Sequence, residues 1–261
     1  IEKNTITGEK PDNATAFAIG DQGYLGLESL GSQSFWRFSP EANTWTPISP
    51  FPGKGRDHAT SFVIDGKAYV GGGGRVNLQQ DFWRYDPASD SWAQVAEFPF
   101  GVSEAIGLSL NGKGYVLAEH PDDDFKSVWE YDPDADAWTQ LVPGSPLPFA
   151  ADAGFVAGGR LFFYSRETYP NNHNRLLEFD LEMSDWFLWE EGNGASYESY
   201  ATGFSLNGKG YLVVQGMIKE FDPAGNTWAT LKGSIPAGRE SGNAFVIGDR
   251  AYFGFGHRGS T

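Results

Sequence analysis

The sequence predicts an all-β protein in which one four-stranded unit is repeated around a closed ring. Three observations support this prediction. A phrase of about eleven residues that ends in Trp occurs five times, an apolar hairpin of constant spacing occurs six times, and no segment has the period of an amphipathic helix. The 34 glycines indicate frequent turns, and the absence of cysteine excludes disulfides, thiolate metal sites and a cysteine nucleophile.

The hairpin supplies the first two strands of each unit. An apolar residue is followed seven positions later by an aromatic residue in six places: Phe17/Tyr24, Phe62/Tyr69, Leu108/Tyr115, Phe155/Phe162, Phe204/Tyr211 and Phe245/Tyr252. Asp65-Gly66, Asn111-Gly112 and Asn207-Gly208 lie between the two members of a pair, and such dipeptides favour the type I′ turn, which needs positive φ at both central residues. The second aromatic residues lie 41 to 49 positions apart, a period typical of propellers, solenoids and related arrays.

The Trp-containing phrase supplies the third and fourth strands. It reads FWRFSPEANTW at 35–45, FWRYDPASDSW at 82–92, VWEYDPDADAW at 128–138, LLEFDLEMSDW at 176–186 and IKEFDPAGNTW at 218–228. Proline cannot donate a hydrogen bond within a central strand, so the residues before Trp are expected to form a turn. The Trp begins the outermost strand and is expected to pack between neighbouring units. Four antiparallel strands per unit, arranged radially, predict β-propeller blades.

We predict one domain with six blades. Their approximate bounds are 13–56, 57–103, 104–150, 151–199, 200–238, and 239–261 together with 1–12. The sixth hairpin, at Asn243–Gly256, has no following phrase. When Pro11 is aligned with Arg56, Ile1–Ile6 falls on a fourth strand, so we expect the ring to close by pairing N- and C-terminal segments in one blade. The third strand of that blade is expected either from residues beyond Thr261, which we favour, or from a partner chain, or it is replaced by direct pairing of the N-terminal strand with the second strand.

The phrase and the Tyr-bearing strand before it make the chain resemble the kelch-repeat propeller family from about Asn13 to Thr261. The glycine pair that this family has after the second strand is found within Gly71–Gly74. The wording GLSLNGKGYV and GFSLNGKGYL is most similar to exported bacterial kelch-repeat proteins. The resemblance therefore implies an extracellular or cell-surface protein, in the outer membrane or a surface complex, with an anchoring segment outside this sequence as an option.

In kelch propellers, the loops that lead into the first strand (approach loops) and those that leave the second (return loops) lie on one face, which usually binds the partner. By this resemblance, the loop face carries our candidate partner-binding residues: Arg56, His58, Arg75, His120, Arg166, Tyr169, His173, Tyr197, Tyr200, Arg239, His257 and Arg258. The approach loops also carry Asp57, Ser103, Glu104 and Asp152. Arg56 and Arg239 are equivalent and resemble the ligand-gripping arginines of kelch domains that bind acidic peptides. Other residue types occupy this position in the remaining repeats, so a full arginine ring is absent.

Two patterns suggest ion binding, but each has a simpler explanation. All four histidines map to the loop face, yet they belong to different blades, whereas metal ligands must converge to about 2.0–2.1 Å from the ion. Asp132, Asp134 and Asp136 form D-x-D-x-D, but Ala137 stands where a calcium loop needs glycine, so we expect a solvated turn. We therefore predict no bound metal and no cofactor.

On the opposite face, a basic residue follows the hairpin turn in five repeats: Lys67, Lys113, Arg160, Lys209 and Arg250. These residues could form a basic ring near the axis, but polar residues are generally favoured after a two-residue turn, and we prefer this simpler explanation.

The charge and the motif content limit the function. A net charge of −15 argues against nucleic acid and anionic lipid as partners, and no apolar run is long enough to span a membrane. The sequence has no nucleophile elbow, no HExxH motif and no phosphate loop. We therefore predict a non-catalytic binding module whose loop face binds a protein or a glycan. The alternative is a sugar-modifying enzyme of the sialic-acid mutarotase type, a class that occurs among kelch proteins.

Overall fold

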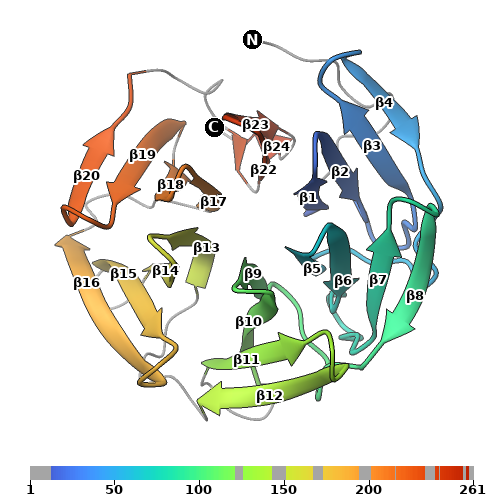
Figure 1. Ribbon diagram of the computed structural model, residues 1–261, viewed down its shortest axis with the longest axis horizontal. Helices are drawn as coiled ribbons and strands as arrows, with labels where there is room; N and C mark the ends of the chain where they lie inside the picture. The colour runs from blue at the N-terminus through green and yellow to red at the C-terminus, as the bar shows by residue number, and fades with distance from the viewer. Residues whose placement is uncertain are drawn as a thin grey trace.

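The computed structural model describes residues 13–120, 126–142, 151–166, 173–193, 201–214, 216–232, 239–240, 242–254 and 257–258. In these residues the strands form five four-stranded antiparallel sheets and two two-stranded sheets. The sheets follow one another around a central axis in chain order, and the first strand of each blade is innermost (Figure 1). The prediction of an all-β propeller with four-stranded antiparallel blades is confirmed.

The five complete blades have short strands throughout. Blade 1 consists of β1 (Thr15–Ile19), β2 (Gln22–Gly26), β3 (Phe35–Ser39) and β4 (Thr44–Pro47). Blade 2 consists of β5 (Thr60–Ile64), β6 (Lys67–Gly71), β7 (Phe82–Asp86) and β8 (Ser91–Val95). Blade 3 consists of β9 (Ile106–Leu110), β10 (Lys113–Glu119), β11 (Lys126–Asp132) and β12 (Ala137–Val142). Blade 4 consists of β13 (Ala151–Ala157), β14 (Arg160–Arg166), β15 (His173–Asp180) and β16 (Asp185–Asn193). Blade 5 consists of β17 (Thr202–Leu206), β18 (Lys209–Val214), β19 (Met217–Asp222) and β20 (Thr227–Thr230).

A partial sixth unit lies between blade 5 and blade 1. Here β22 (Asn243–Ile247) pairs with β23 (Arg250–Gly254), and β21 (Arg239–Glu240) pairs with β24 (His257–Arg258). Strand β22 contacts both β17 and β1, so the hairpin occupies the space between the first and last complete blades (Figure 1). The rings of Phe38 in blade 1 and Tyr252 lie 5.6 Å apart. The predicted fourth strand at Ile1–Ile6 lies outside the described residues.

The seven-residue spacing in the hairpins reflects stacked cross-strand pairs. Phe62 and Tyr69 are direct partners across β5 and β6, and their rings stack at 5.2 Å with an interplanar angle of 8°. Phe204 and Tyr211 repeat this arrangement at 5.0 Å and 3°. The turn at Asn111-Gly112 has φ values of 52° and 75°, as the type I′ turn requires, and the Asp65-Gly66 and Asn207-Gly208 turns are similar. The hairpin interpretation is therefore confirmed.

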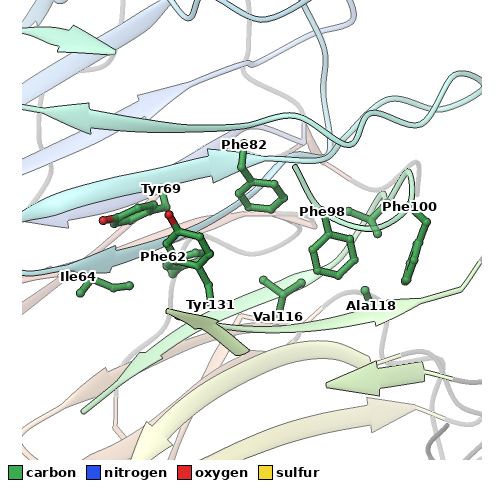
Figure 2. Close-up of a cluster of buried hydrophobic side chains, with 10 residues drawn as sticks. Phe62, Ile64, Tyr69, Phe82, Phe98, Phe100, Val116, Ala118 and Tyr131 are labelled. Atoms are coloured by element: carbon green, nitrogen blue, oxygen red, sulfur yellow. The ribbon is translucent and has the colours of Figure 1, made fainter. Parts of the chain in front are cut away.

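The apolar core lies between the blades rather than within one of them. Figure 2 shows one such cluster, in which Phe62 and Phe82 of blade 2 face Val116 and Tyr131 of blade 3. Phe98, on the segment that connects the two blades, is 1% exposed and fills the outer part of the same cluster. Because each blade buries its faces against its neighbours, no blade has a complete core of its own.

The Trp of the repeated phrase joins each of two blades to the one before it. The Trp92 indole N–H donates to the carbonyl oxygen of Ser49 at 2.9 Å, and the carboxylate of Asp90 accepts from the Ser49 N–H at 3.1 Å. Between blades 2 and 3, Trp138 donates to the Ala96 carbonyl at 3.0 Å, and Asp136 accepts from the Ala96 N–H at 2.8 Å. We call this two-bond arrangement the Trp–Asp clip.

The clip depends on a left-handed residue two positions before Trp. The residues at this position all have positive φ, between 46° and 53°: Asn43, Asp90, Asp136, Ser184 and Asn226. Tyr131 also donates its hydroxyl to Asp136 at 2.7 Å, and Tyr85 donates to Asp90 at 2.8 Å. Burial and this contact with a carboxylate both raise the pKa of Tyr131 far above its ordinary value.

The D-x-D-x-D stretch is a turn, as expected. Asp132 accepts hydrogen bonds from the backbone N–H groups of Asp134 and Ala135, and Asp136 is occupied by the clip. Among the described residues, no group of three potential ligands is placed to hold a metal ion. The carboxylates of Asp132 and Asp136 therefore stabilise the turn and the junction between the blades.

Four of the five basic residues after the hairpin turns are paired within the fold. Lys67 contacts Asp86 at 3.2 Å, Lys113 contacts Asp132, and Lys209 contacts Glu220 at 2.6 Å. Arg160 contacts Glu178 at 3.0 Å and donates to the Pro223 carbonyl of the next blade at 3.2 Å. These pairs account for four of the five residues as local structure, while Arg250 is 70% exposed and lies 3.8 Å from Asp249. Within the described residues, no helix has the length and apolar character needed to cross a membrane.

We expect Asp136→Ala to destabilise the protein by about 3 kcal/mol. The substitution leaves the Tyr131 hydroxyl and the Ala96 N–H without their acceptor, and it places alanine in the left-handed region. Urea denaturation followed by Trp fluorescence measures the change. Asp136→Asn keeps an acceptor and tolerates the same φ, so it should lose less than half as much. Asp134→Ala, in the exposed part of the same turn, should change stability by under ~0.5 kcal/mol. Equal losses for Asp136→Ala and Asp134→Ala would contradict the clip.

Candidate functional site

A cavity of about 1120 Å³ opens on the axis at the loop face. All five complete blades and the sixth hairpin contribute the beginning of their first strand to its wall, through Thr15, Thr60, Ile106, Ala151, Thr202 and Asn243. Return-loop residues such as Arg75, Leu78 and His120 also line it. Approach and return loops therefore meet on one face, as the resemblance to kelch propellers implied. We call this cavity the axial funnel.

Small residues keep the funnel open while the first strands pack closely. A Cβ atom on Gly107 would lie 2.5 Å from the Ser61 carbonyl oxygen, and one on Gly203 would lie 2.3 Å from that of Gly154. The Thr15 hydroxyl donates to the Ala59 carbonyl of the next blade at 2.6 Å. The innermost strands therefore contact one another directly. Because their side chains are small, they do not fill the space on the axis, and the funnel remains open.

Three equivalent approach-loop residues form one side of the funnel. Asn13, His58 and Glu104 lie four positions before the first apolar residue of their hairpins, and all have left-handed backbones, with φ of 55°, 55° and 54°. The His58 N–H donates to the Asn13 carbonyl at 3.1 Å, and the Glu104 N–H donates to the His58 carbonyl at 3.3 Å. Left-handed backbone in residues other than glycine is uncommon and is enriched at functional sites.

Charged side chains meet at this side of the funnel. Arg75 Nε donates to Asp57 Oδ2 at 2.9 Å, His58 Nδ1 lies 3.2 Å from Asp57 Oδ1, and His58 Nε2 lies 3.5 Å from Glu104 Oε1. The Asp57 side chain is 2% exposed, that of His58 is 14% exposed, and those of Arg75 and Glu104 extend into solvent. Burial alone would raise the pKa of Asp57, but the adjacent His58 and Arg75 outweigh it and hold that pKa below its ordinary value.

The glycine-rich return loop of blade 2 brings Arg75 to this position. Gly72, Gly73 and Gly74 have φ of 63°, 94° and 92°, and a Cβ atom on Gly73 would lie 2.5 Å from the Asp57 carbonyl oxygen. The Gly74 N–H donates to that carbonyl at 2.8 Å, while the Gly73 N–H donates to the Val102 carbonyl at 2.7 Å. Only residues without a side chain let the loop pass this close to both approach loops.

The wall contributed by blade 3 carries Glu119 and His120. The His120 ring packs against Phe100 at 4.6 Å with an interplanar angle of 63°. Glu119 lies 3.4 Å from the ammonium nitrogen of Lys126. Asp152, at the start of blade 4, also lines the funnel. The described wall therefore combines carboxylates, imidazoles and one guanidinium with small polar residues, which suits a polar ligand.

One candidate, Arg56, has a structural role instead. Its side chain is 1% exposed, and its guanidinium forms two hydrogen bonds with Asp81, at 2.6 and 2.8 Å. It also donates to the Gly72 carbonyl at 3.0 Å and lies over the Phe51 ring. The prediction that Arg56 grips a partner is wrong for this structure, because its donors are used to hold the return loop. The sequence position alone could not distinguish an arginine that faces the axis from one that is buried behind the loop.

The other candidates divide into three groups. His58, Arg75 and His120 line the funnel. Arg166, His173, Arg239, His257 and Arg258 lie on described strands, but their side chains are not described. Tyr169, Tyr197 and Tyr200 lie outside the described residues. The prediction that no metal or cofactor is bound stays a prediction.

Asp57 and Glu104 join the site although neither was among our selected candidates. Both stand on approach loops, and in an acidic chain a carboxylate is a weak signal. The sequence signal that could have identified Glu104 is its position in the repeat, because it occupies the same position in blade 3 as His58 occupies in blade 2. The two residues become significant only when the ring closes adjacent approach loops to within 3.5 Å.

Comparisons with known proteins agree with this architecture. A family model described as the Kelch motif matches residues 55–99. N-acetylneuraminate epimerase 2 of Escherichia coli O6:H1 and N-acetylneuraminate epimerase of Escherichia coli K12 are each 40% identical to this chain over 63 residues. That stretch covers 23% of this chain and 17% of the length of each relative. A solved structure described as the structure of YjhT has a TM-score of 0.74 and 18% identity, covering 99% of this chain and 93% of that chain, and it shows the fold.

We expect Arg56→Met to destabilise the protein by about 3 kcal/mol, because it leaves the carboxylate of Asp81 partly buried without its partner. Burial raises the pKa of Asp81, but hydrogen bonds from Arg56 and Trp83 outweigh it and hold that pKa below its ordinary value. The Arg56–Asp81 pair therefore adds its full contribution to the free energy of unfolding above an ordinary aspartate pKa of about 4. This contribution is lost as the pH falls through the lowered pKa of Asp81. Urea denaturation at several pH values measures the difference. Arg250→Met, at a side chain that is 70% exposed, is the matched control. A loss no larger than that of the control would contradict the structural role.

Proposed function

We propose that this chain, a member of the kelch-repeat β-propeller family, binds a small polar ligand of the carbohydrate class in its axial funnel. The observation that carries the proposal is the group of polar side chains that meets in the funnel, in which His58, Glu104 and Arg75 line the wall within one connected set of contacts. Sugars present many hydroxyl groups, and charged donors and acceptors form the stronger hydrogen bonds with them.

The dimensions and the lining of the funnel support a small ligand over a protein segment. Its volume of about 1120 Å³ lies just above the range of about 300–1,000 Å³ that is typical of small-molecule sites. The described lining consists mainly of alanine, glycine, threonine and charged residues, with Leu78 and Ile106 as its larger apolar side chains. A site for an apolar peptide would need deeper aromatic or aliphatic pockets.

A second candidate function is the interconversion of sugar anomers. The specific observation that favours it is the pairing of His58 with Glu104, together with the 40% identity over 63 residues to N-acetylneuraminate epimerases. In this reaction a base removes the proton of the anomeric hydroxyl while an acid protonates the ring oxygen, and the ring C–O bond breaks to give the open-chain carbonyl form. Closure on the other carbonyl face reverses both proton transfers. An imidazole and a carboxyl group, which lie 3.5 Å apart at one end of the polar funnel, are the side-chain types that general acid–base catalysis uses.

Calorimetric titration with N-acetylneuraminate and with a neutral N-acetylated hexosamine tests the proposal. We expect at least one of the two sugars to bind the wild-type protein, and Glu104→Gln or His58→Ala to weaken that binding by about tenfold or more, since hydrogen bonds to charged groups contribute about 1.5–3 kcal/mol. Glu182→Gln, in an exposed turn on the opposite face, should bind like the wild type. Absence of binding to both sugars, or equal binding by Glu104→Gln and Glu182→Gln, would overturn the proposal.

Exchange NMR on the sugar that binds distinguishes a binding protein from an enzyme, because an enzyme must accelerate the exchange of the two anomers above the rate in buffer alone.

Two further proposals concern the partner of the loop face and the location of the protein. We propose that the loop face also contacts a protein or glycan partner, with Tyr169, Tyr197 and Tyr200 as the aromatic contacts, because variable loops on a regular scaffold are where binding surfaces concentrate.

We propose that the protein is exported and acts at the cell surface. This proposal rests on the similarity of its repeat sequences to those of exported bacterial kelch-repeat proteins. Detection of the protein only in the cytosolic fraction of its source would contradict the second proposal.

We also propose that the ring has six blades and that residues 1–12 complete the sixth. The support is the position of β22 between β17 and β1, together with the repeat register that aligns Pro11 with Arg56. Because the chain has no cysteine, spin labels can be attached at chosen sites alone. The distance between labels at Thr5→Cys and Asp249→Cys should be shorter than that between labels at Thr5→Cys and Asn111→Cys, on the opposite side of the ring. A longer first distance would show that the N-terminal segment lies elsewhere.

A further inference from the structure

Asp57 lies behind the funnel wall, where one carboxylate contacts two funnel residues. We infer that Asp57 is the positioning residue of the site and that it fixes both the tautomer of His58 and the direction of Arg75. This inference rests on the proposed function for its consequence in ligand binding. Its structural part, the state of the His58 ring, can be measured without any ligand.

The contacts of Asp57 are divided between its two oxygens. Oδ2 accepts from Arg75 Nε at 2.9 Å, and Oδ1 faces His58 Nδ1 at 3.2 Å. The Asp57 side chain is 2% exposed, so it does not form part of the surface that a ligand would touch. Its backbone is fixed as well, because its carbonyl oxygen accepts from the Gly74 N–H at 2.8 Å. Asp57 therefore acts through its two neighbours.

The buried contact with His58 determines where the imidazole proton lies. Asp57 Oδ1 and His58 Nδ1 are both buried and lie 3.2 Å apart, and neither forms an aligned hydrogen bond in the described residues, either with the other or with a third group. Each atom is therefore the nearest available partner of the other. A neutral imidazole carries its proton on one nitrogen and an acceptor lone pair on the other. A lone pair on Nδ1 would face a buried carboxylate and leave both atoms unsatisfied, which is costly. The proton is therefore on Nδ1, and Nε2 is left to face Glu104 and the funnel.

The same carboxylate orients the guanidinium of Arg75. Its Nε is held by Asp57, while the side chain as a whole is 58% exposed and lines the funnel. The two terminal nitrogens of the planar guanidinium are then directed as a fixed pair of donors rather than as a freely rotating group. The charged groups around His58 in the described residues are Asp57 on its own loop, Arg75 on the return loop of blade 2 and Glu104 on the approach loop of blade 3.

An amide cannot replace this carboxylate. Asp57 presents one acceptor oxygen to Arg75 and another to His58, whereas asparagine has one acceptor atom and one donor group. In Asp57→Asn, the amide NH2 group must face either Arg75 Nε–H or His58 Nδ1–H. One of the two funnel residues then loses its orientation, even though the shape of the side chain is unchanged.

Ring nitrogen chemical shifts in a ¹H–¹⁵N correlation spectrum, recorded above pH 8, test the inference. The spectrum of His58→Gln identifies the His58 signals by their loss. We expect the Nδ1-protonated tautomer for His58 in the wild-type protein and a shift toward the Nε2-protonated tautomer in Asp57→Asn. Asp65→Asn, the same substitution in an exposed hairpin turn of the same blade, should leave the signals unchanged. Affinity for a sugar that binds the wild-type protein should fall by about tenfold or more in Asp57→Asn and remain unchanged in Asp65→Asn.

The outcomes separate this inference from the proposed function. An Nε2-protonated His58 in the wild-type protein would overturn the inference, and this measurement does not require the variant to fold. An unchanged tautomer together with unchanged sugar affinity in a folded Asp57→Asn protein would also overturn it. If the tautomer changes as expected but neither sugar binds the wild-type protein, the positioning role of Asp57 is supported and the proposed carbohydrate site is wrong.

Discussion

The contact between the Trp of one blade and the backbone of the preceding blade is the constraint on which the ring depends. Each blade is a thin sheet whose faces are apolar, so it is stable only when a neighbour covers it. The Trp92 indole covers that surface and also donates to the Ser49 carbonyl, while Asp90 accepts from the N–H of the same residue. One residue of the preceding blade is thus held at both its donor and its acceptor, which fixes the spacing and tilt between blades.

The clip is not repeated at every junction. Ser184 occupies the aspartate position in blade 4, and in the described residues the Trp186 and Trp228 indole nitrogens have no hydrogen-bond partner. Blades 4 and 5 are joined in another way, by Arg160, which bonds to Glu178 within its blade and to the Pro223 carbonyl across the junction. The Gly158 N–H also donates to the Gly208 carbonyl at 2.8 Å. The first three blades therefore share one joining mechanism, and the junction between blades 4 and 5 uses a different one.

The funnel follows from the same closure. When the blades are held at a fixed spacing, the first strands converge on the axis, and only small residues fit between them. The approach loops of adjacent blades are then brought into contact, which places His58 beside Glu104 and lets the glycine loop set Arg75 against Asp57. Arg56 and Arg75 show how the loops divide their tasks. Arg56 is buried and ties the return loop to Asp81, whereas Arg75 is held at its Nε and exposes the rest of its guanidinium.

The sequence by itself determined the architecture of this protein. The seven-residue spacing specified stacked hairpins, the Asx-Gly dipeptides specified their turns, and the period of the Trp phrase specified the blades. Even the clip has a sequence signature, because Tyr85 and Tyr131 precede Asp90 and Asp136, whereas Phe38, Phe179 and Phe221 precede Asn43, Ser184 and Asn226. These features are local, so a linear pattern can specify them. Only the tertiary structure decided which loop residues form the site. Glu104 lies one repeat after Asp57 and His58, and Arg56 is buried against Asp81, whereas Arg75 extends into the funnel. Such differences arise when the ring closes, since closure brings residues about 46 positions apart in sequence into contact.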